Sequence, residues 1–100
     1  MQAADLFKAL ANDKRLQILA WLKDPRAHFP PQRDGDLVED GVCANFLAEK
    51  LEVSASPLSE HMRVLVAAGL VTPKPIKQWT FYRRNSERAE ELAKLLGESL

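Results

Sequence analysis

Cysteine is almost absent from the sequence, because Cys43 is the only one among 100 residues. One thiol excludes an intramolecular disulfide framework, and we expect a protein of the reducing cytosol. The sequence also lacks any apolar run near the roughly 20 residues that a membrane helix needs, and its first residues show no signal-peptide pattern. Together these absences predict a cytoplasmic chain with no membrane partner.

Glycine is scarce as well, and none of the four glycines belongs to a Gly-rich loop of the kind that cradles phosphate. No arrangement of Ser, His and Asp, of Cys and His, or of paired carboxylates stands out for catalysis. The sequence therefore predicts a protein that is not an enzyme and that needs no cofactor.

The chain also carries no net charge, since 14 Lys and Arg balance 14 Asp and Glu. A zero sum argues weakly against nucleic-acid binding, because many DNA-binding domains are basic. The charges are segregated along the chain, however. Thr72–Arg84 has four cations and no acid, whereas Asp24–Gly41 has two cations and five acids. This distribution favours a protein that turns one face toward phosphate.

The stretch Ala44–Val71 has the pattern of two short helices joined by a tight turn. Each helix has apolar residues at the spacing of one buried face, and the second helix begins near Ser56. Ser54 or Ser56 can cap the second helix, and Gly69 is placed to end it in a left-handed conformation. The pattern predicts a helix-turn-helix whose second helix can enter a DNA major groove; the alternative is an ordinary helical hairpin in an all-α bundle. The two apolar stripes are Cys43, Phe46, Leu47 and Leu51, then Leu58, Met62, Leu65 and Val66.

A basic hairpin is predicted directly after these two helices. Leu70–Thr72 and Trp79–Arg84 have strand propensity, and Pro73 and Pro75 mark an edge or a turn. A hairpin in this position is a wing, which we assign to Pro73–Arg84. The alternative is a purely structural β-hairpin.

Helices are also predicted at both ends of the chain. The first spans Ala3–Leu10, a second begins after a cap at Asn12 or Asp13 and ends by Asp24, and Ser86 can cap the last. Two leucine-rich terminal helices in so small a domain suggest a shared dimer surface, although the same periodicity fits helices that pack on their own domain. The predicted dimer residues are Leu6, Phe7, Leu10, Leu92, Leu95 and Leu96.

Asp24–Gly41 is predicted to be a loop, since it contains three prolines, two glycines and many acids. Loops of this length are usually functional or mobile, and Phe29 and Leu37 are the candidate anchors of this one to the core. Residues 1–100 are predicted to form one domain that is mainly α with a small β-hairpin. We expect a winged helix-turn-helix with about five helices plus a two-stranded wing.

Over nearly its whole length the sequence resembles the ArsR/SmtB family of bacterial winged-helix repressors. The resemblance rests on the opening AADLFKALANDKRLQILAWL, on FLAEKLEVSASPLSEHMRVLVAAGLV and on the WTFYR strand. It implies a homodimer formed by the first and last helices and a double-stranded DNA operator with two-fold symmetry. It also implies repression that is relieved by a metal, a redox change or another signal.

Several departures from the family pattern bear on the mechanism. The family's Cys-x-Cys metal pair is reduced here to Cys43 alone, and the last helix, where a second family site has Asp and His, contains no histidine. A thiophilic ion needs three or four thiolate or imidazole ligands, so neither familiar metal site is expected. Glu52 and Lys77 stand at turn positions where the family often has glycine. A left-handed backbone there would cost a non-glycine residue about 1 kcal/mol.

Polar residues on the second helix of the motif and on the wing are the predicted DNA contacts. Ser59 and Glu60 could reach base edges, whereas Arg63 and the wing cations supply affinity more than sequence reading. For Glu60, simple solvation or a pair with Arg63 is an equally open alternative. His61 is interpreted as a hydrogen-bonded residue at the edge of the core. The predicted DNA contacts are Ser54, Ser56, Ser59, Glu60, Arg63, Lys74, Lys77, Gln78, Arg83 and Arg84.

Cys43 and His28 are the candidate sensor residues. Cys43 shares an apolar helix face, which indicates a buried structural thiol; the functional alternative is a redox or electrophile sensor, since a helix N-terminus favours the thiolate. His28 and Asp36 could complete a metal-ligand set with Cys43.

The sequence thus predicts a homodimeric DNA-binding repressor that is released by an unidentified small-molecule or redox effector. The alternative is a winged-helix protein-interaction module that does not bind DNA. The zero net charge and Glu60 favour that alternative, and the basic wing opposes it.

Overall fold

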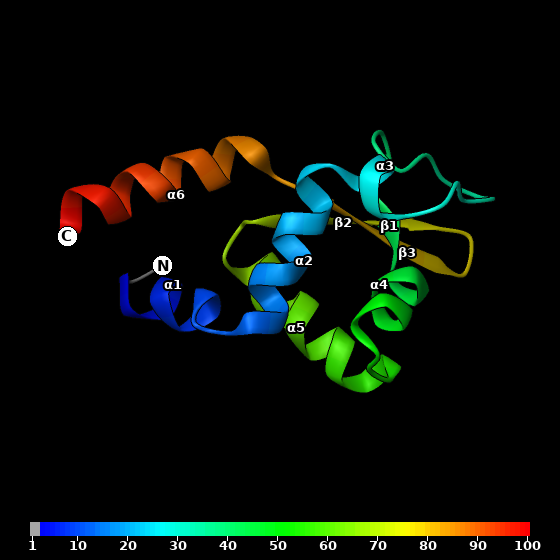
Figure 1. The fold of residues 1–100 in the computed structure, drawn as a ribbon, viewed down its shortest axis with the longest axis horizontal. Helices are drawn as coiled ribbons and strands as arrows, with labels where there is room; N and C mark the ends of the chain where they lie inside the picture. The colour runs from blue at the N-terminus through cyan, green and yellow to red at the C-terminus, as the bar shows by residue number, and fades with distance from the viewer. Residues whose placement is uncertain (1–2) are drawn as a thin grey trace.

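The computed structural model describes residues 3–100, which form a mainly helical domain with a small antiparallel sheet (Figure 1). The helix-turn-helix and wing are present as predicted. Two elements were not predicted: a two-residue strand before the helix-turn-helix, and a four-residue helix inside the segment Asp24–Gly41, which we call the acidic loop. The helices are α1 (Ala3–Leu10), α2 (Asp13–Lys23), α3 (Pro25–His28), α4 (Ala44–Leu51), α5 (Ala55–Ala67) and α6 (Ser86–Ser99), and the strands are β1 (Val42–Cys43), β2 (Val71–Ile76) and β3 (Trp79–Arg84).

Helices α4 and α5 are joined by a turn that requires a left-handed residue. Glu52 takes that conformation, with φ 58° and ψ 44°, although it has a side chain that disfavours it. At the other end of α5, Gly69 is also left-handed, and the N–H groups of Gly69 and Leu70 donate to the carbonyls of Val66 and Leu65. This pair of bonds is a Schellman motif, so the predicted glycine stop is confirmed.

The predicted side-chain caps are only partly confirmed. Asn12 caps α2 by accepting a hydrogen bond from the Arg15 N–H at 3.1 Å. Ser54 occupies the N-cap position of α5 but its hydroxyl accepts no capping bond. The last helix is capped by Asn85, which accepts from the Arg88 N–H, so the prediction of Ser86 was wrong by one residue.

The sheet has the strand order β1-β3-β2, so the wing hairpin gains a third strand on its inner side. Strand β2 is longer than predicted and runs through Pro73 and Pro75. It can do so because it is an edge strand. Pro73 and Pro75 are two residues apart, so the positions where each lacks an N–H face the same way, away from β3, and no hydrogen bond to β3 is lost. A two-residue turn connects Ile76 to Trp79, and Lys77 takes a left-handed φ of 55° there.

The core lies between α2, α4, α5 and the inner face of the sheet. Its most deeply buried side chains come from all of these elements and include Ile18, Val42, Leu47, Met62 and Leu65. The acidic loop closes over one side of this core, anchored by Phe29 and Leu37, which are both buried as predicted. Gly35 lies against the ring of Phe81, and Gly41, at φ 108°, lies against the backbone of Tyr82.

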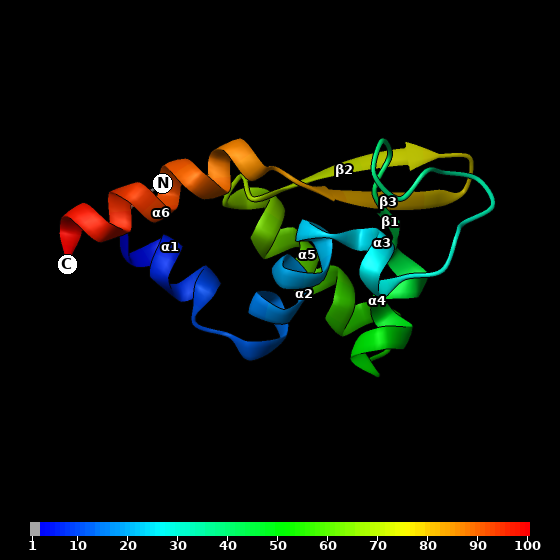
Figure 2. The same cartoon turned by 45° about the horizontal axis from the view of Figure 1, so that its top comes forward.

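Helices α1 and α6 lie side by side at one end of the molecule, away from the wing tip (Figures 1 and 2). The chain is elongated as a result, with extents of 42 × 25 × 22 Å. Helix α6 has 14 residues, of which Leu92 is the buried one. Within residues 3–100, no helix combines the length and the apolar composition needed to cross a bilayer.

Candidate nucleic-acid interface

The outer face of α5 is polar and exposed, while its inner face supplies core residues. Ser56, Ser59, Glu60 and Arg63 are all exposed, on the side of the helix away from Leu58, Met62 and Leu65. This two-sided pattern places four of the predicted DNA contacts together on a rigid helix that is fixed to the core through its other face.

Glu60 and Arg63 form a two-bonded ion pair on this face. The Arg63 guanidinium donates to both carboxylate oxygens of Glu60, at 2.6 Å and 3.1 Å. This bond lowers the pKa of Glu60 and raises that of Arg63. The alternative interpretation of Glu60 as the partner of Arg63 therefore describes the DNA-free protein, and base reading by Glu60 requires this pair to be opened or shared.

Arg15, on α2, connects the end of α1 to α5. Its guanidinium donates to the carbonyls of Ala9 at 2.6 Å and Lys8 at 3.2 Å, at the end of α1, and lies 3.2 Å from Nδ1 of His61 on α5. Because a guanidinium can only donate, Nδ1 of His61 is the acceptor and is unprotonated. Burial, and next the charge of Arg15, lower the pKa of His61. The prediction of a hydrogen-bonded residue at the core edge is confirmed.

The lysines of the wing are covered by carboxylates of the acidic loop. Lys77 lies 2.9 Å from the Asp34 carboxylate, and Lys74 is bonded to Asp40. The hydrogen bond from Lys77 lowers the pKa of Asp34, and the bond from Lys74 lowers the pKa of Asp40. The acidic segment Asp24–Gly41 and the basic segment Thr72–Arg84, which are separate in the sequence, therefore lie together in the fold. Their opposite charges were the signal that they pair.

The arginines at the other end of the hairpin have different partners. Arg83 donates to the backbone carbonyl of Glu39 at 3.1 Å, and Arg84 donates to the hydroxyl of Ser86 at 2.8 Å. In the part of the chain that the structure describes, neither arginine forms an ion pair with a carboxylate. The strand register pairs Val71 with Arg84, which is the end farthest from Lys77.

The predicted contacts therefore fall into three groups rather than one surface. The first is the outer face of α5 together with Ser54 at its N-cap, the second is the wing tip with Lys74, Lys77 and Gln78, and the third is the wing base with Arg83 and Arg84. The fold brings the members of each group together, and their contact with DNA stays a prediction.

The candidate sensor residues are not gathered into a metal site. Cys43 is buried, and its backbone N–H donates to the side-chain carbonyl of Gln32 at 2.7 Å. His28 is exposed at the end of α3. Across residues 3–100, no three His, Cys, Asp or Glu side chains are grouped closely enough to hold an ion. The ligand set of His28, Asp36 and Cys43 is therefore not assembled.

The six predicted dimer residues have two kinds of environment. Leu6 and Leu92 are buried in the core of their own chain, which leaves little of either side chain for a partner to cover, and their place in a dimer stays a prediction. Phe7 and Leu95 are 41% and 48% exposed, and Leu10 and Leu96 are half-buried. An apolar surface thus remains along α1 and α6 after the chain has folded.

Comparison with known proteins gives consistent results. Residues 37–72, which include the whole helix-turn-helix, match the family described as "Bacterial regulatory protein, arsR family". The chain is 40% identical over 96 residues to an uncharacterized HTH-type transcriptional regulator, YbzH, of Bacillus subtilis, covering 96% of each protein. It is 35% identical over 95 residues to the arsenical resistance operon repressor of the same bacterium, covering 94% of this chain and 73% of that one.

A solved structure is similar in the same way. The structure of reduced HlyU from Vibrio cholerae superposes with a TM-score of 0.64 at 31% identity, covering 96% of this chain and 85% of that one. HlyU of that organism is described as a transcriptional activator. Relatives at these identities therefore include a repressor and an activator.

Proposed function

Because the chain belongs to the ArsR family of bacterial transcriptional regulators, with a DNA-binding helix-turn-helix, we propose that it is a homodimeric repressor of a DNA operator with two-fold symmetry. The observation that carries this proposal is the two-sided α5, which presents polar residues outward and is fixed to the core inward. A helix held in this way can enter a major groove without being deformed.

The outer face of α5 and the wing tip have different roles in the proposed contact with DNA. Ser56, Ser59 and Glu60 lie on the exposed face of α5, from which their polar groups can contact base edges when the helix lies in the groove. Glu60 can accept a hydrogen bond from a cytosine amino group. Arg63 and the wing-tip residues Lys77 and Gln78 hold phosphates and set the register of the helix on the duplex.

Dimerisation is supported by the terminal helices. An isolated helix of 14 residues is only marginally stable in water, and α6 has just Leu92 buried against its own domain. A second copy that covers Phe7 and Leu95 would bury the apolar surface left along α1 and α6. The expected assembly is therefore a dimer through the terminal helices, which leaves the two α5 faces free for two half-sites.

The central test is the DNA affinity of an Arg63→Ala variant, measured by fluorescence anisotropy with DNA from upstream of the protein's own gene and with scrambled DNA. We expect selective binding by the wild type and an affinity about tenfold lower in the variant, since a charge-assisted phosphate contact is lost. The matched control is Arg26→Ala, which removes an exposed arginine from α3. Arg63→Ala binding with the affinity and salt dependence of the wild type would contradict a role for α5 in DNA binding.

Regulation and assembly need separate measurements. Sedimentation should give a dimer for the wild type and a monomer for a Phe7→Glu, Leu95→Glu variant, because two buried charges in the interface would be unpaired. Transcription in vitro from the DNA upstream of the protein's own gene should fall when the protein is added. A rise would make the protein an activator, and equally weak binding to both DNAs would favour the protein-interaction alternative.

A further inference from the structure

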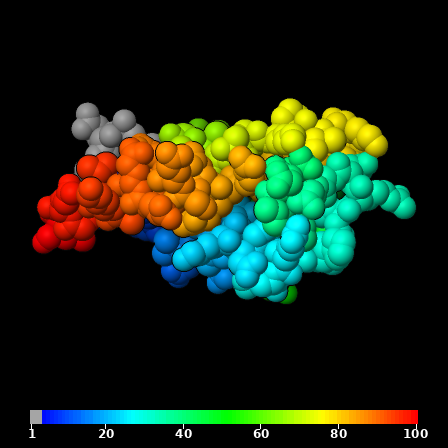
Figure 3. Space-filling model, turned by 90° about the horizontal axis from the view of Figure 1, so that it is seen from above, coloured from blue at the N-terminus to red at the C-terminus, as the bar shows by residue number. Residues whose placement is uncertain are grey.

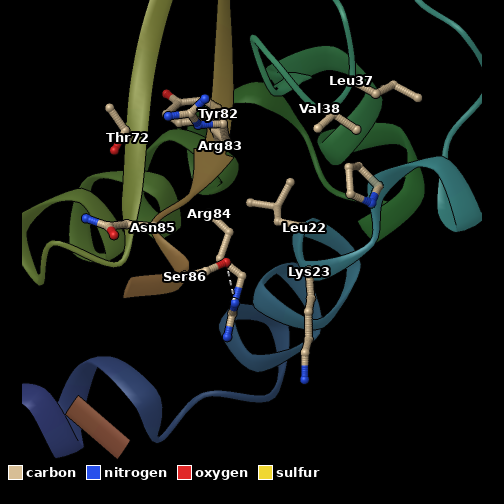
Figure 4. A pocket seen from close by; sticks show the side chains of 11 residues that line it. Leu22, Lys23, Leu37, Val38, Thr72, Tyr82, Arg83, Arg84, Asn85 and Ser86 are labelled. Carbon is tan, nitrogen blue, oxygen red and sulfur yellow. Dashed lines mark hydrogen bonds between the residues drawn. The ribbon is translucent and has the colours of Figure 1, made fainter. Parts of the chain in front are cut away.

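A pocket of about 410 Å³ lies where the wing meets α6 (Figure 4). It is bounded by the end of α2, by the acidic loop at Leu37 and Val38, and by the junction between β3 and α6. Its volume is within the range of small-molecule sites. Seen from above, these three regions meet along one side of the molecule, on the face shown in Figure 3.

The lining of this pocket combines an apolar floor with a cationic rim. Leu22, Leu37 and Val38 supply the apolar part, and Val38 is 41% exposed. Lys23, Arg83 and Arg84 supply the cations, and Thr72, Asn85 and Ser86 add polar groups. No Asp or Glu is among the residues that line it.

Two of the rim cations, Lys23 and Arg84, form no ion pair within residues 3–100. Arg83 differs, because it lies beside Glu39 and Asp40, and its charge adds to the hydrogen bond from Lys74 in lowering the pKa of Asp40. Arg83 and Arg84 donate to the carbonyl of Glu39 and the hydroxyl of Ser86. Figure 4 shows Leu22 between Arg84 and Val38, with Lys23 and Arg84 extending to the same side. An anionic group placed there would meet two cations at once, with an apolar surface directly behind them.

A neighbouring pocket does not share this excess of cations. The pocket inside the acidic loop is larger, about 720 Å³, but Arg26 and Arg33 share it with Asp34, Asp36 and Asp40. Its three acids outnumber its two cations, so it offers an anion no net attraction.

We propose that the pocket at the wing base binds a small organic anion, a carboxylate joined to an apolar body. The carboxylate lies between Arg84 and Lys23, because guanidinium and ammonium groups are strong donors to carboxylate oxygens. The apolar body lies over Leu22 and Val38 and removes their exposed surface from water.

The position of the pocket gives its occupant a means to affect the rest of the molecule. It contacts the wing through Thr72 and Arg83, the acidic loop through Val38, and the first turn of α6 through Ser86. A ligand that bridges these elements fixes the wing relative to the helix that we assign to the dimer. This regulatory role rests on the proposed function, whereas occupancy of the site does not.

Isothermal titration of the full chain with octanoate, in the absence of DNA, tests the site directly. We expect binding by the wild type and at least tenfold weaker binding by Arg84→Gln and by Lys23→Gln. Lys23 is exposed at the end of α2, so its substitution leaves the fold intact even if Arg84→Gln should disturb the start of α6. Lys94→Gln, an exposed cation of α6 outside the pocket, is the matched control and should bind octanoate as the wild type does.

Two further probes separate the parts of the ligand. Octanol has the apolar body without the charge, and inorganic phosphate has charge without the body, so each should bind at least tenfold more weakly than octanoate. Phosphate that binds as tightly as octanoate, or octanoate binding that Lys23→Gln leaves unchanged, would overturn the proposal.

The regulatory role is tested with the DNA from the anisotropy measurement. Octanoate should shift the DNA affinity of the wild type and leave that of Lys23→Gln unchanged. Octanoate that binds the free protein but shifts neither affinity would overturn the regulatory role alone. Failure of all DNA binding, with octanoate still bound, would instead contradict the proposed function.

Discussion

The two ends of the β2–β3 hairpin carry the same sign of charge but present it differently. At the tip, Lys74 and Lys77 are held by the carboxylates of Asp40 and Asp34. At the base, Arg83 and Arg84 are bonded only to neutral oxygens within the described residues. The difference teaches that a run of basic residues does not measure the positive potential a surface offers, because the fold can bring acids from elsewhere to cover it.

This difference has an energetic consequence for DNA binding. Exposed ion pairs contribute only about 0–1 kcal/mol each, so phosphate can displace Asp34 and Asp40 from the wing lysines. The displaced carboxylates would still lie near the duplex and would repel its phosphates. The acidic loop is therefore expected to reduce the DNA affinity that the tip could otherwise provide.

The largest effect is expected from breaking the attachment of the acidic loop. In Gly41→Ala the new Cβ would lie 2.3 Å from the carbonyl oxygen of Tyr82, at a φ of 108° that alanine disfavours. We expect the free energy of unfolding to fall by about 2–4 kcal/mol, measured by urea denaturation. The loop acids would at the same time be freed from the wing.

Gly97→Ala provides the matched control for this change. Apart from the backbone of its own helix, a Cβ at Gly97, inside α6, meets no atom of residues 3–100 within 4 Å. Stability should rise by up to about 1 kcal/mol, because alanine is the better helix former. Equal stability of the Gly41→Ala variant and the wild type would show that the loop does not pack on β3 as described.

An intermediate effect is expected from removing the carboxylates that pair with the lysines at the wing tip, so that the tip, like the base, has no ion pair. Asp34→Asn with Asp40→Asn removes both carboxylates and keeps the side-chain size. DNA affinity at low salt should increase about tenfold, and the slope of its dependence on salt should steepen by up to about 2, as two lysines become available to phosphate.

Glu39→Gln is the control for this loop charge, because Glu39 engages the wing through its backbone carbonyl. It should change DNA affinity far less than the double variant. The same increase from Glu39→Gln would mean that overall loop charge, and not the pairing at the tip, limits binding.

The smallest effect is expected from lowering the pH, which should change the ion pairs at the wing tip and leave the hydrogen bonds at the wing base unchanged. The pKa values of Asp34 and Asp40 are lowered by their lysine partners below the ordinary 3.8. The pairs therefore stabilise the fold above that value, and their contribution is lost as the pH falls through the lowered pKa values. The hydrogen bonds of Arg83 and Arg84 go to groups that do not titrate there.

NMR of the lysine and arginine side chains between pH 6 and the onset of acid unfolding would follow this difference. The Nζ signals of Lys74 and Lys77 should shift, while the Nε signal of Arg84, whose guanidinium donates to the Ser86 hydroxyl, should not. In the Asp34→Asn, Asp40→Asn variant the lysine shifts should disappear. An Arg84 signal that titrates with the lysines would contradict the distinction between tip and base.

The long periodic elements of this fold could be predicted from the sequence. Helices α1 and α2, the helix-turn-helix and the hairpin follow from apolar spacing and from turn residues such as Gly69. The left-handed Glu52 and Lys77 were indicated by comparison with the family pattern, and both are left-handed in the structure. These features depend on residues close together in the chain.

The missed features depend on contacts between distant residues or on very short elements. Strand β1 has two residues, too few to show a period, and it exists because it pairs with β3 about 40 residues later. The pairs Lys74–Asp40 and Lys77–Asp34 span 34 and 43 residues. Of the interface, the outer face of α5 was predictable, but the neutralised state of the wing tip was not.

The Arg15 guanidinium, which joins the end of α1 to His61 on α5, has a consequence for the length of the operator. A dimer formed through α1 and α6, as we propose, would make the distance between its two α5 helices depend on the angle between α1 and α5, which the bonds of Arg15 help to hold. Half-sites that face the same side of B-DNA recur about every 34 Å. We therefore expect that altering Arg15 changes which separation of half-sites the proposed dimer accepts and leaves unchanged which bases are read.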